Sequence, residues 1–306
     1  MIPPELSIVI PCYNEIDNVR GIVAAVTREA MIHAASHEII LIDNHSTDGT
    51  REAIADLCRE DVRVRAILNN RNYGQMRSPT HGIYQACGRA VIGMGADFQD
   101  PPAMIGPFLS LWRGGAKVVL AQRRSERASP LLSLTRRLGY AILGRVADHP
   151  IVPGATGFGL FDRAVVDTLR QWREPEPFFR GMVIESGFPL ALFPFDRPPR
   201  TDGETKNGFK SLFSFALSGL SGSAKSLLRL PIILSLWGFG AALLLGFAAA
   251  FALNGTLLLL ALAAGCFATL LLFLGLIGDQ VRLIAERTRN VPLVIEEARL
   301  NFPDAP

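Results

Sequence analysis

Charged side chains are absent from one long part of this 306-residue sequence. Residues 231–278 contain no Asp, Glu, Lys or Arg, although 19% of the whole chain is charged. Because a membrane-spanning helix needs about 20 apolar residues, this stretch is long enough for two spans and too short for three. Asn254 and Gly255 interrupt it with turn-forming residues. We expect two transmembrane helices, at 231–253 and 256–277; a buried hairpin of a soluble protein is the disfavoured alternative.

Several other features are scarce. A formal net charge of +3 is too small to indicate a nucleic-acid partner. The four cysteines form no CxxC pair, which fits a reducing compartment, and we interpret them as packing residues. No basic and then apolar leader opens the chain, so a cleaved signal peptide is not expected. The histidines show no HExxH spacing, the pattern that would indicate a zinc site.

Basic residues flank the charge-free stretch on both sides. Lys225 and Arg229 precede it, and Arg282, Arg287 and Arg289 follow it, whereas the connecting turn is neutral. Positively charged flanks favour the cytoplasmic side of a membrane. We therefore expect a multi-pass inner-membrane protein with both ends in the cytoplasm.

Upstream, short apolar runs alternate with segments of helical periodicity. Strands are predicted at 6–10, 38–43, 62–68, 90–94 and 118–121. One helix is predicted to begin at residue 16. A second follows the cap candidates Ser46, Thr47 and Asp48 and runs to residue 58, and a third covers residues 73–86. This alternation predicts an α/β domain over residues 1–207, with a mostly parallel sheet covered by helices on both faces.

Three polar loops follow strands of this predicted sheet, where ligands bind in such folds. They contain Tyr13, Asn14 and Glu15; Asp43, Asn44, Ser46 and Asp48; and Asp97, Gln99 and Asp100. The first loop lacks the GxGxxG of a dinucleotide-binding enzyme, and no GxxxxGK[ST] phosphate loop is present. Asp97 and Gln99 offer oxygen ligands for a divalent cation that would stabilise a departing diphosphate. Helix capping with turn polarity is the alternative explanation of this pair.

Four motifs carry a resemblance to family 2 glycosyltransferases of the GT-A fold. They are SIVIPCYNE at 7–15, DNHSTDGT at 43–50, NNRNYG at 69–74 and DFQDPP at 97–102. More narrowly, the sequence resembles the polyprenyl-phosphate branch, with its bactoprenol glucosyltransferases and dolichol-phosphate mannose synthases. GFGLFDR at 157–163, FFRG at 178–181, GETK at 203–206 and the tail from residue 275 fit bacterial members with two C-terminal helices.

The resemblance implies roles for individual residues in donor binding. Pro11, Tyr13 and Glu15 would line the pocket for base and ribose, and Asp43 would accept a hydrogen bond from the base. Asp97 would reach the diphosphate and a Mg²⁺ or Mn²⁺ ion, with Gln99 beside it as a second metal ligand.

Two positions depart from the family pattern. Gly95 stands where the family often has the first acid of DxD, and Asn44 stands where a second aspartate is common. The loss of one carboxylate weakens a metal site without abolishing it, because Mg²⁺ keeps waters and substrate phosphates among its ligands.

Basic residues supply candidates for binding the acceptor. Arg123, Arg124 and Arg127 follow a predicted strand, and guanidinium groups suit phosphate oxygens. Related enzymes contact the lipid phosphate with such a pair, which implies Arg124 and Arg127; a solvated charge run is the alternative. Arg200 and Lys206 lie in a second basic loop, similar to the segment that closes over the diphosphate. We predict Asp97, Arg124 and Lys206 as catalytic residues.

The remaining segments connect the predicted domain to the membrane. Residues 208–230 fit an interfacial amphipathic helix or linker. Residues 131–146 fit either another amphipathic helix or a packed core helix, and residues 278–306 are expected to form a cytoplasmic tail. Related proteins assemble through their membrane helices, which implies a homo-oligomer.

Together these expectations describe an inverting transferase that moves a hexose from a nucleotide sugar, UDP-linked by analogy, to undecaprenyl or dolichyl phosphate. A phosphate monoester has its second pKa near ~6, so the acceptor is mostly dianionic at neutral pH and needs no strong general base. One in-line displacement then inverts the anomeric carbon. A catalytically silent membrane scaffold is the alternative, motivated by Gly95 and Asn44. A processive polysaccharide synthase is disfavoured by the two spans and by the absence of QxxRW.

Overall fold

The computed structural model describes residues 3–124, 152, 154–196, 198, 255–289 and 291–303. Several predicted features lie outside these residues: the segments 131–146 and 208–230, the first predicted span 231–253, and the basic residues Arg127, Arg200 and Lys206.

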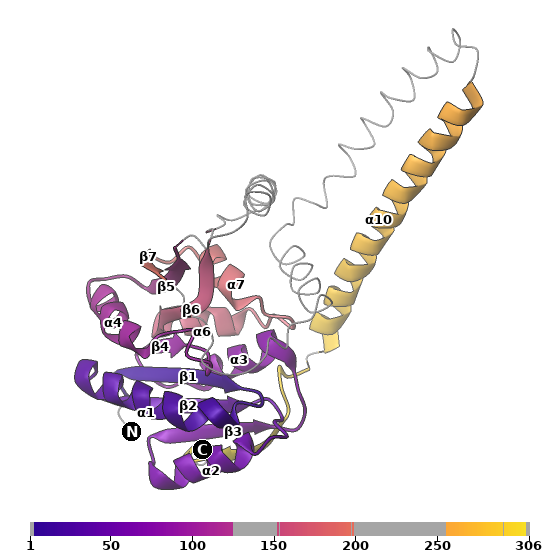
Figure 1. The fold of residues 1–306 in the computed structure, drawn as a ribbon. Helices are drawn as coiled ribbons and strands as arrows, with labels where there is room; N and C mark the ends of the chain where they lie inside the picture. Colours follow the sequence, from indigo (N-terminus) through magenta and orange to yellow (C-terminus); the bar gives the residue numbers. More distant parts are fainter. Residues whose placement is uncertain are drawn as a thin grey trace.

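The strands of the described residues form one mixed sheet in the order β7-β5-β6-β4-β1-β2-β3-β8 (Figure 1). They are β1 Leu6–Cys12, β2 His37–Asp43, β3 Val64–Asn69, β4 Ala90–Gly93, β5 Val118–Arg123, β6 Ala155–Asp162, β7 Leu190–Phe195 and β8 Glu296–Leu300. β4, β1, β2 and β3 are parallel, as are β5 and β7. β6 is antiparallel to β4 and β5, and β8 is antiparallel to β3. The parallel part of the prediction is confirmed, and the outer part of the sheet is mixed.

Helices cover both faces of this sheet (Figure 1). They are α1 Ile16–His33, α2 Thr50–Glu60, α3 Gly74–Gln85, η1 Pro102–Met104, α4 Ile105–Arg113, α6 Arg163–Gln171 and α7 Phe179–Glu185. Successive strand residues point to opposite faces, so β1 contributes to two cores. Ile8 and Ile10 belong to the core that includes side chains of α1, α2 and α4, whereas Val9 belongs to the core that includes side chains of α3, α6 and α7.

Several element boundaries differ from the sequence prediction by one or two residues, and two of the differences have a local cause. β3 begins at Val64 rather than at residue 62, because a turn in which Asp61 accepts a hydrogen bond from the Arg63 backbone N–H leaves Val62 exposed. α2 begins at Thr50, after Gly49 with φ of +95°. Of the three predicted caps, only Asp48 accepts a hydrogen bond from the first turn, from the Thr50 backbone N–H at 3.1 Å.

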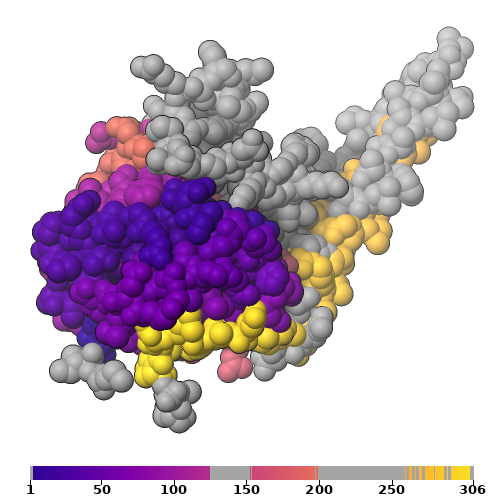
Figure 2. Space-filling model, turned by 60° about the horizontal axis from the view of Figure 1, so that its bottom comes forward, coloured from indigo at the N-terminus to yellow at the C-terminus, as the bar shows by residue number. Residues whose placement is uncertain are grey.

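The C-terminal part of the chain contains one long helix, α10, Gly255–Arg289. It includes the second predicted span and continues beyond it. Within the described residues, no helix meets the length and apolarity required of a membrane span. After α10 the chain returns to the domain, and Figure 2 shows this last segment (yellow) lying along the N-terminal residues. Of the segment 278–306, predicted as a cytoplasmic tail, one part belongs to α10 and another is the edge strand β8 of the sheet.

Candidate functional site

The loops after β1, β2 and β4 lie at one edge of the sheet. β1 pairs in parallel with both other strands, in registers that set Cys12 opposite Asp43 and Val9 opposite Gly93. The carboxyl ends of the three strands therefore meet at this edge, as the sequence predicts. β5 runs in the same direction as β4, because both are antiparallel to the intervening β6. Arg123, the last residue of β5, belongs to the same edge.

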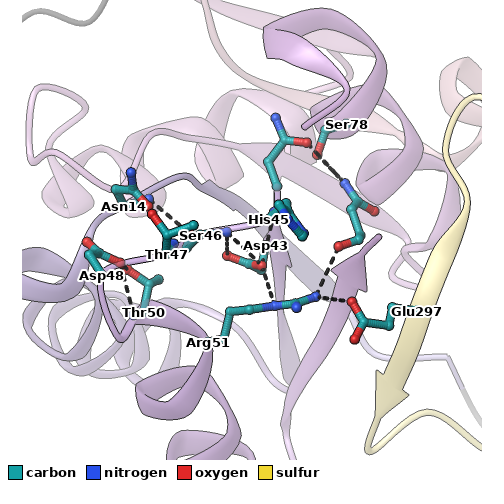
Figure 3. A network of polar contacts seen from close by, with 12 residues as sticks. Asn14, Asp43, His45, Ser46, Thr47, Asp48, Thr50, Arg51, Ser78 and Glu297 are labelled. Atoms are coloured by element: carbon teal, nitrogen blue, oxygen red, sulfur yellow. Dashed lines mark hydrogen bonds and ion pairs between the residues drawn. The ribbon is translucent and has the colours of Figure 1, made fainter. Parts of the chain in front are cut away.

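The first two loops are joined by hydrogen bonds between their residues (Figure 3). The Asn14 backbone N–H donates to Ser46 Oγ at 2.9 Å, and the Thr47 backbone N–H donates to Asn14 Oδ1 at 2.8 Å. Asn14 has φ of +54°, a left-handed conformation that asparagine tolerates better than most residues. The Glu15 backbone N–H donates to Thr50 Oγ1 at 2.9 Å. These contacts hold the two loops as one unit.

The residues predicted to line the base and ribose pocket differ in placement. Tyr13 is 39% exposed, as a side chain that receives a ligand should be. Glu15 is the N-cap residue of α1, and its Oε2 accepts a hydrogen bond from Asn18 Nδ2 at 2.9 Å. Pro11 lies within β1 rather than after it, and is partly buried. Their roles in donor binding stay predictions.

Asp43 is fully buried at the end of β2. Its Oδ2 forms an ion pair with Arg51 Nε at 2.9 Å and accepts a hydrogen bond from the His45 backbone N–H at 3.1 Å. Both carboxylate oxygens lie 3.2 Å from the Ser46 backbone N, which donates to them. Asp43 therefore shapes its own loop, and its predicted hydrogen bond to a base stays a prediction.

Asn44 connects the second loop to the loop after β3. Its Nδ2 donates to Asn72 Oδ1 at 2.8 Å and to the Gly74 carbonyl at 3.3 Å. Its Oδ1 accepts from the Tyr73 backbone N–H at 2.8 Å and from Asn69 Nδ2 at 3.3 Å. The Asn44 side chain thus both donates and accepts hydrogen bonds. These bonds connect the motif at 69–74 to the loop after β2.

The third loop brings two carboxylates over Gly95. A Cβ at Gly95 would lie 3.2 Å from Asp97 Oδ1 and 3.4 Å from Asp100 Oδ2. The Gly95 backbone N–H donates to Asp100 Oδ2 at 2.8 Å, and the Gln99 backbone N–H donates to Asp97 Oδ1 at 3.2 Å. Both acids therefore lie next to the space that a side chain at Gly95 would enter, the position where the resemblance implies a first acid.

This pair of carboxylates fits a divalent cation whose remaining ligands are waters and phosphate oxygens. Hard carboxylate oxygens suit Mg²⁺ or Mn²⁺, and Mg²⁺ is commonly held by one or two protein carboxylates together with waters and phosphates. Across the described ranges, no group of three or more His, Cys, Asp or Glu side chains is placed to hold a metal. Gln99 meets Asp97 through its backbone, and its side-chain role stays a prediction.

Of the predicted phosphate-binding residues, Arg123 and Arg124 are described. Arg124 is exposed and forms an ion pair with Asp196 at 3.7 Å, a distance that gives a weak interaction at a surface. The backbone N–H groups of Arg123 and Arg124 donate to the Gly154 and Phe195 carbonyls, both at 2.9 Å. These bonds attach the end of β5 to its neighbours, while the Arg124 side chain extends into solvent.

Cys12, the last residue of β1, has an unreactive thiol. Burial, followed by the negative charges of Asp43, Glu15 and Asp48, raises the pKa of Cys12 well above its ordinary value, so its thiol stays protonated. Cys12 and Cys58 are buried packing residues, as predicted, whereas Cys87 and Cys266 are exposed, which corrects that prediction.

The sequence analysis missed two residues that organise this edge. Arg51 contacts the ends of both β2 and β3, since its Nη2 donates to the Asn69 carbonyl at 3.0 Å. Asn69 is fully buried and its Nδ2 also donates to Ser78 Oγ at 3.0 Å. The position of Asn69 in a recognised motif was a usable signal for its importance. Nothing in the local sequence marks Arg51.

Comparisons with known proteins agree with this geometry. Residues 7–170 match the family model described as glycosyl transferase family 2. An uncharacterized glycosyltransferase of Synechocystis is 35% identical over 71% of this chain and 68% of its own length. A bactoprenol glucosyl transferase of Shigella phage SfV is 29% identical over 71% of both proteins. A crystal structure of a mycobacterial protein, 14% identical, has a TM-score of 0.50 over 71% of this chain and 74% of that one.

Proposed function

This chain belongs to glycosyl transferase family 2, and from that premise we propose that it moves a hexose from a nucleotide sugar to a polyprenyl phosphate with inversion. The observation that carries the proposal is the similarity, over 71% of both chains, to a protein named for glucosyl transfer to bactoprenol. A UDP-sugar is the donor we propose. Undecaprenyl or dolichyl phosphate is the acceptor.

We also propose that transfer occurs at the cytoplasmic face of the inner membrane. A polyprenyl acceptor is itself a membrane lipid, so the enzyme must meet it at the bilayer. The charge-free residues 231–278 and their basic flanks support two membrane helices. Residues 208–230 would then lie at the interface and bring the catalytic domain to the lipid phosphate.

The reacting groups require little acid or base chemistry. An oxygen of the acceptor phosphate attacks the anomeric carbon, and the bond from that carbon to the donor's diphosphate breaks on the opposite side. The diphosphate leaves with the bonding electrons, and the dianionic acceptor has no proton to lose. The protein therefore acts mainly by alignment and by stabilising charge.

Asp97 and Asp100 would hold a divalent cation, with Gln99 as a further predicted ligand. The cation would supply positive charge beside the leaving diphosphate. Arg124, together with Arg123 and the predicted partners Arg127 and Arg200, would orient the acceptor phosphate. Lys206 would contact the diphosphate.

A direct test is transfer from radiolabelled UDP- and GDP-sugars to a polyprenyl phosphate in detergent, with Mg²⁺ or Mn²⁺ against EDTA. We expect one donor to give a lipid-linked product that EDTA abolishes. Asp97→Ala should lose this product, whereas Asp56→Ala, which removes an exposed acid of α2, should retain it. Absence of product with every donor, from folded wild-type protein, would contradict the proposal and favour the silent scaffold.

A further inference from the structure

The C-terminal strand β8 contacts the residue that holds Asp43 in place. Glu297 Oε2 forms an ion pair with Arg51 Nη2 at 2.9 Å, and the two residues are 246 positions apart in the chain. On its other side, Arg51 Nε contacts Asp43 at 2.9 Å (Figure 3). Arg51 is therefore held between an acid of the C-terminal strand and an acid of the predicted nucleotide loop.

The chain of contacts continues from Asp43 into the first loop. Asp43 accepts hydrogen bonds from the His45 and Ser46 backbone N–H groups, and Ser46 Oγ accepts one from the Asn14 backbone N–H. Asn14 separates Tyr13 from Glu15, two residues predicted to line the base and ribose pocket. A continuous series of polar contacts thus leads from Glu297 to that pocket.

β8 also holds the end of β3, which Arg51 contacts as well. The Asn70 backbone N–H donates to the Ile295 carbonyl at 3.2 Å, and Asn69 lies opposite Glu296 where the pairing register shifts. Arg77 of α3 donates to the Pro292 carbonyl at 2.9 Å. The loop after β3 is therefore fixed from the C-terminal segment as well as from Asn44.

We propose that Glu297 and Arg51 are positioning residues for the nucleotide part of the donor, so that β8 sets the geometry of a site built by the N-terminal loops. This inference rests on the proposed function. In this role Arg51 acts through Asp43, which it orients together with the backbone of residues 43–46. Its two acidic partners occupy Nε and Nη2 of its guanidinium group.

The test compares variants of the full-length protein in detergent. Glu297→Ala should raise the donor KM and the Kd for UDP or GDP about two- to fivefold, the range that one exposed ion pair supports. The acceptor KM and kcat should stay within about twofold, because neither depends on the base pocket. Glu297→Gln should restore donor binding, since its amide oxygen still accepts from Arg51. Glu60→Ala, which removes an exposed acid of the same helix as Arg51, is the matched control.

Hydrogen exchange supplies a readout that does not need turnover. The His45 and Ser46 amides, which donate to Asp43, should exchange faster in Glu297→Ala than in the wild type or in Glu60→Ala. Equal nucleotide affinity and equal exchange in the wild type and Glu297→Ala would overturn this inference and leave the proposed function standing. Failure of the wild type to bind either nucleotide would overturn both.

Discussion

The contacts of the Asn44 side chain favour an amide at a position where the family resemblance implies an aspartate. Its NH₂ group donates to Asn72 Oδ1 and to the Gly74 carbonyl, and its oxygen accepts from two further N–H groups. A carboxylate keeps the accepting half of this pattern and cannot supply the donating half. Asn44 is 7% exposed, so a charge placed there is also poorly hydrated.

We therefore predict that Asn44→Asp lowers the free energy of unfolding by about 1–3 kcal/mol, the cost of leaving buried polar groups without partners. Asn72→Asp is the matched control, because Asn72 is exposed and its Oδ1 only accepts, from Asn44 and from the Gly74 backbone N–H. That variant should change stability by less than about 0.5 kcal/mol. Denaturant unfolding in one detergent measures both; equal losses would contradict the hydrogen-bond explanation.

At the scale of elements, the approach of α3 to the sheet depends on one glycine. A Cβ at Gly82 would lie 2.8 Å from Val9 Cγ1 and 3.3 Å from Ile42 Cγ2, closer than normal packing allows. Val9 is a stiff, buried side chain of the central strand β1, so it has little room to move. The helix that follows the loop at 69–74 therefore lies directly against the two strands that carry the first and second loops.

Gly82→Ala should destabilise the domain, because overpacking costs about 1–3 kcal/mol and the gain in helix propensity offsets only about 0.5–1 kcal/mol. Gly21→Ala in α1 should instead be neutral or stabilising, since a Cβ there meets Phe98 at an ordinary 3.4 Å. Thermal unfolding of the two variants measures the contrast. A rise in Tm in both would show that propensity, and not the distance between α3 and β1, decides the outcome.

At the scale of the whole molecule, the C-terminal segment packs against the N-terminal half of the domain. β8 pairs with β3, and Asn301 Nδ2 donates to the Val64 carbonyl at 2.8 Å. α10 contacts the domain separately, through a two-bonded ion pair of Arg282 with Glu176 at 2.7 and 3.0 Å. A helix that includes a predicted span is thus followed by the strand that contacts the predicted nucleotide loop through Arg51.

The attachment of β8 should depend on pH through Glu296. Burial opposes ionisation of this carboxyl, but hydrogen bonds from His81 and Arg299 outweigh burial and hold its pKa at about 2, below the ordinary 4.5. A depressed pKa contributes stability that is complete above the ordinary value and is lost as the pH falls from about 4.5 towards 2. His81 lies 2.5 Å from Glu296 and Arg299 pairs with it.

We predict that acidification from about pH 6 to about pH 3 lowers the Tm of the wild type more than that of Glu296→Gln, because the variant has no carboxylate to protonate. Glu60→Gln, which alters an exposed acid, should follow the wild type. Scanning calorimetry at the two pH values gives the comparison. Identical pH dependence in the wild type and Glu296→Gln would show that this carboxylate does not stabilise the folded state.

The sequence by itself determined which loops meet at the candidate site. Alternating strands and helices favour a parallel sheet, and parallel strands bring the loops after β1, β2 and β4 to one edge. The motifs in those loops indicated the family. The alternation of strands and helices depends on neighbours a few residues apart, so periodicity indicates it, whereas the family was indicated by the resemblance of the motifs.

Only the tertiary structure decided how the site is supported. The ion pair of Arg51 with Glu297 depends on the register between β3 and β8, and no local pattern sets the register of a strand far along the chain. The same holds for the amide group of Asn44, which donates to Asn72 in the loop after β3 and to the carbonyl of Gly74 at the start of α3. Residues 296–300 read EEARL, a charged segment with little strand character, and they form a strand because the edge of β3 accepts them.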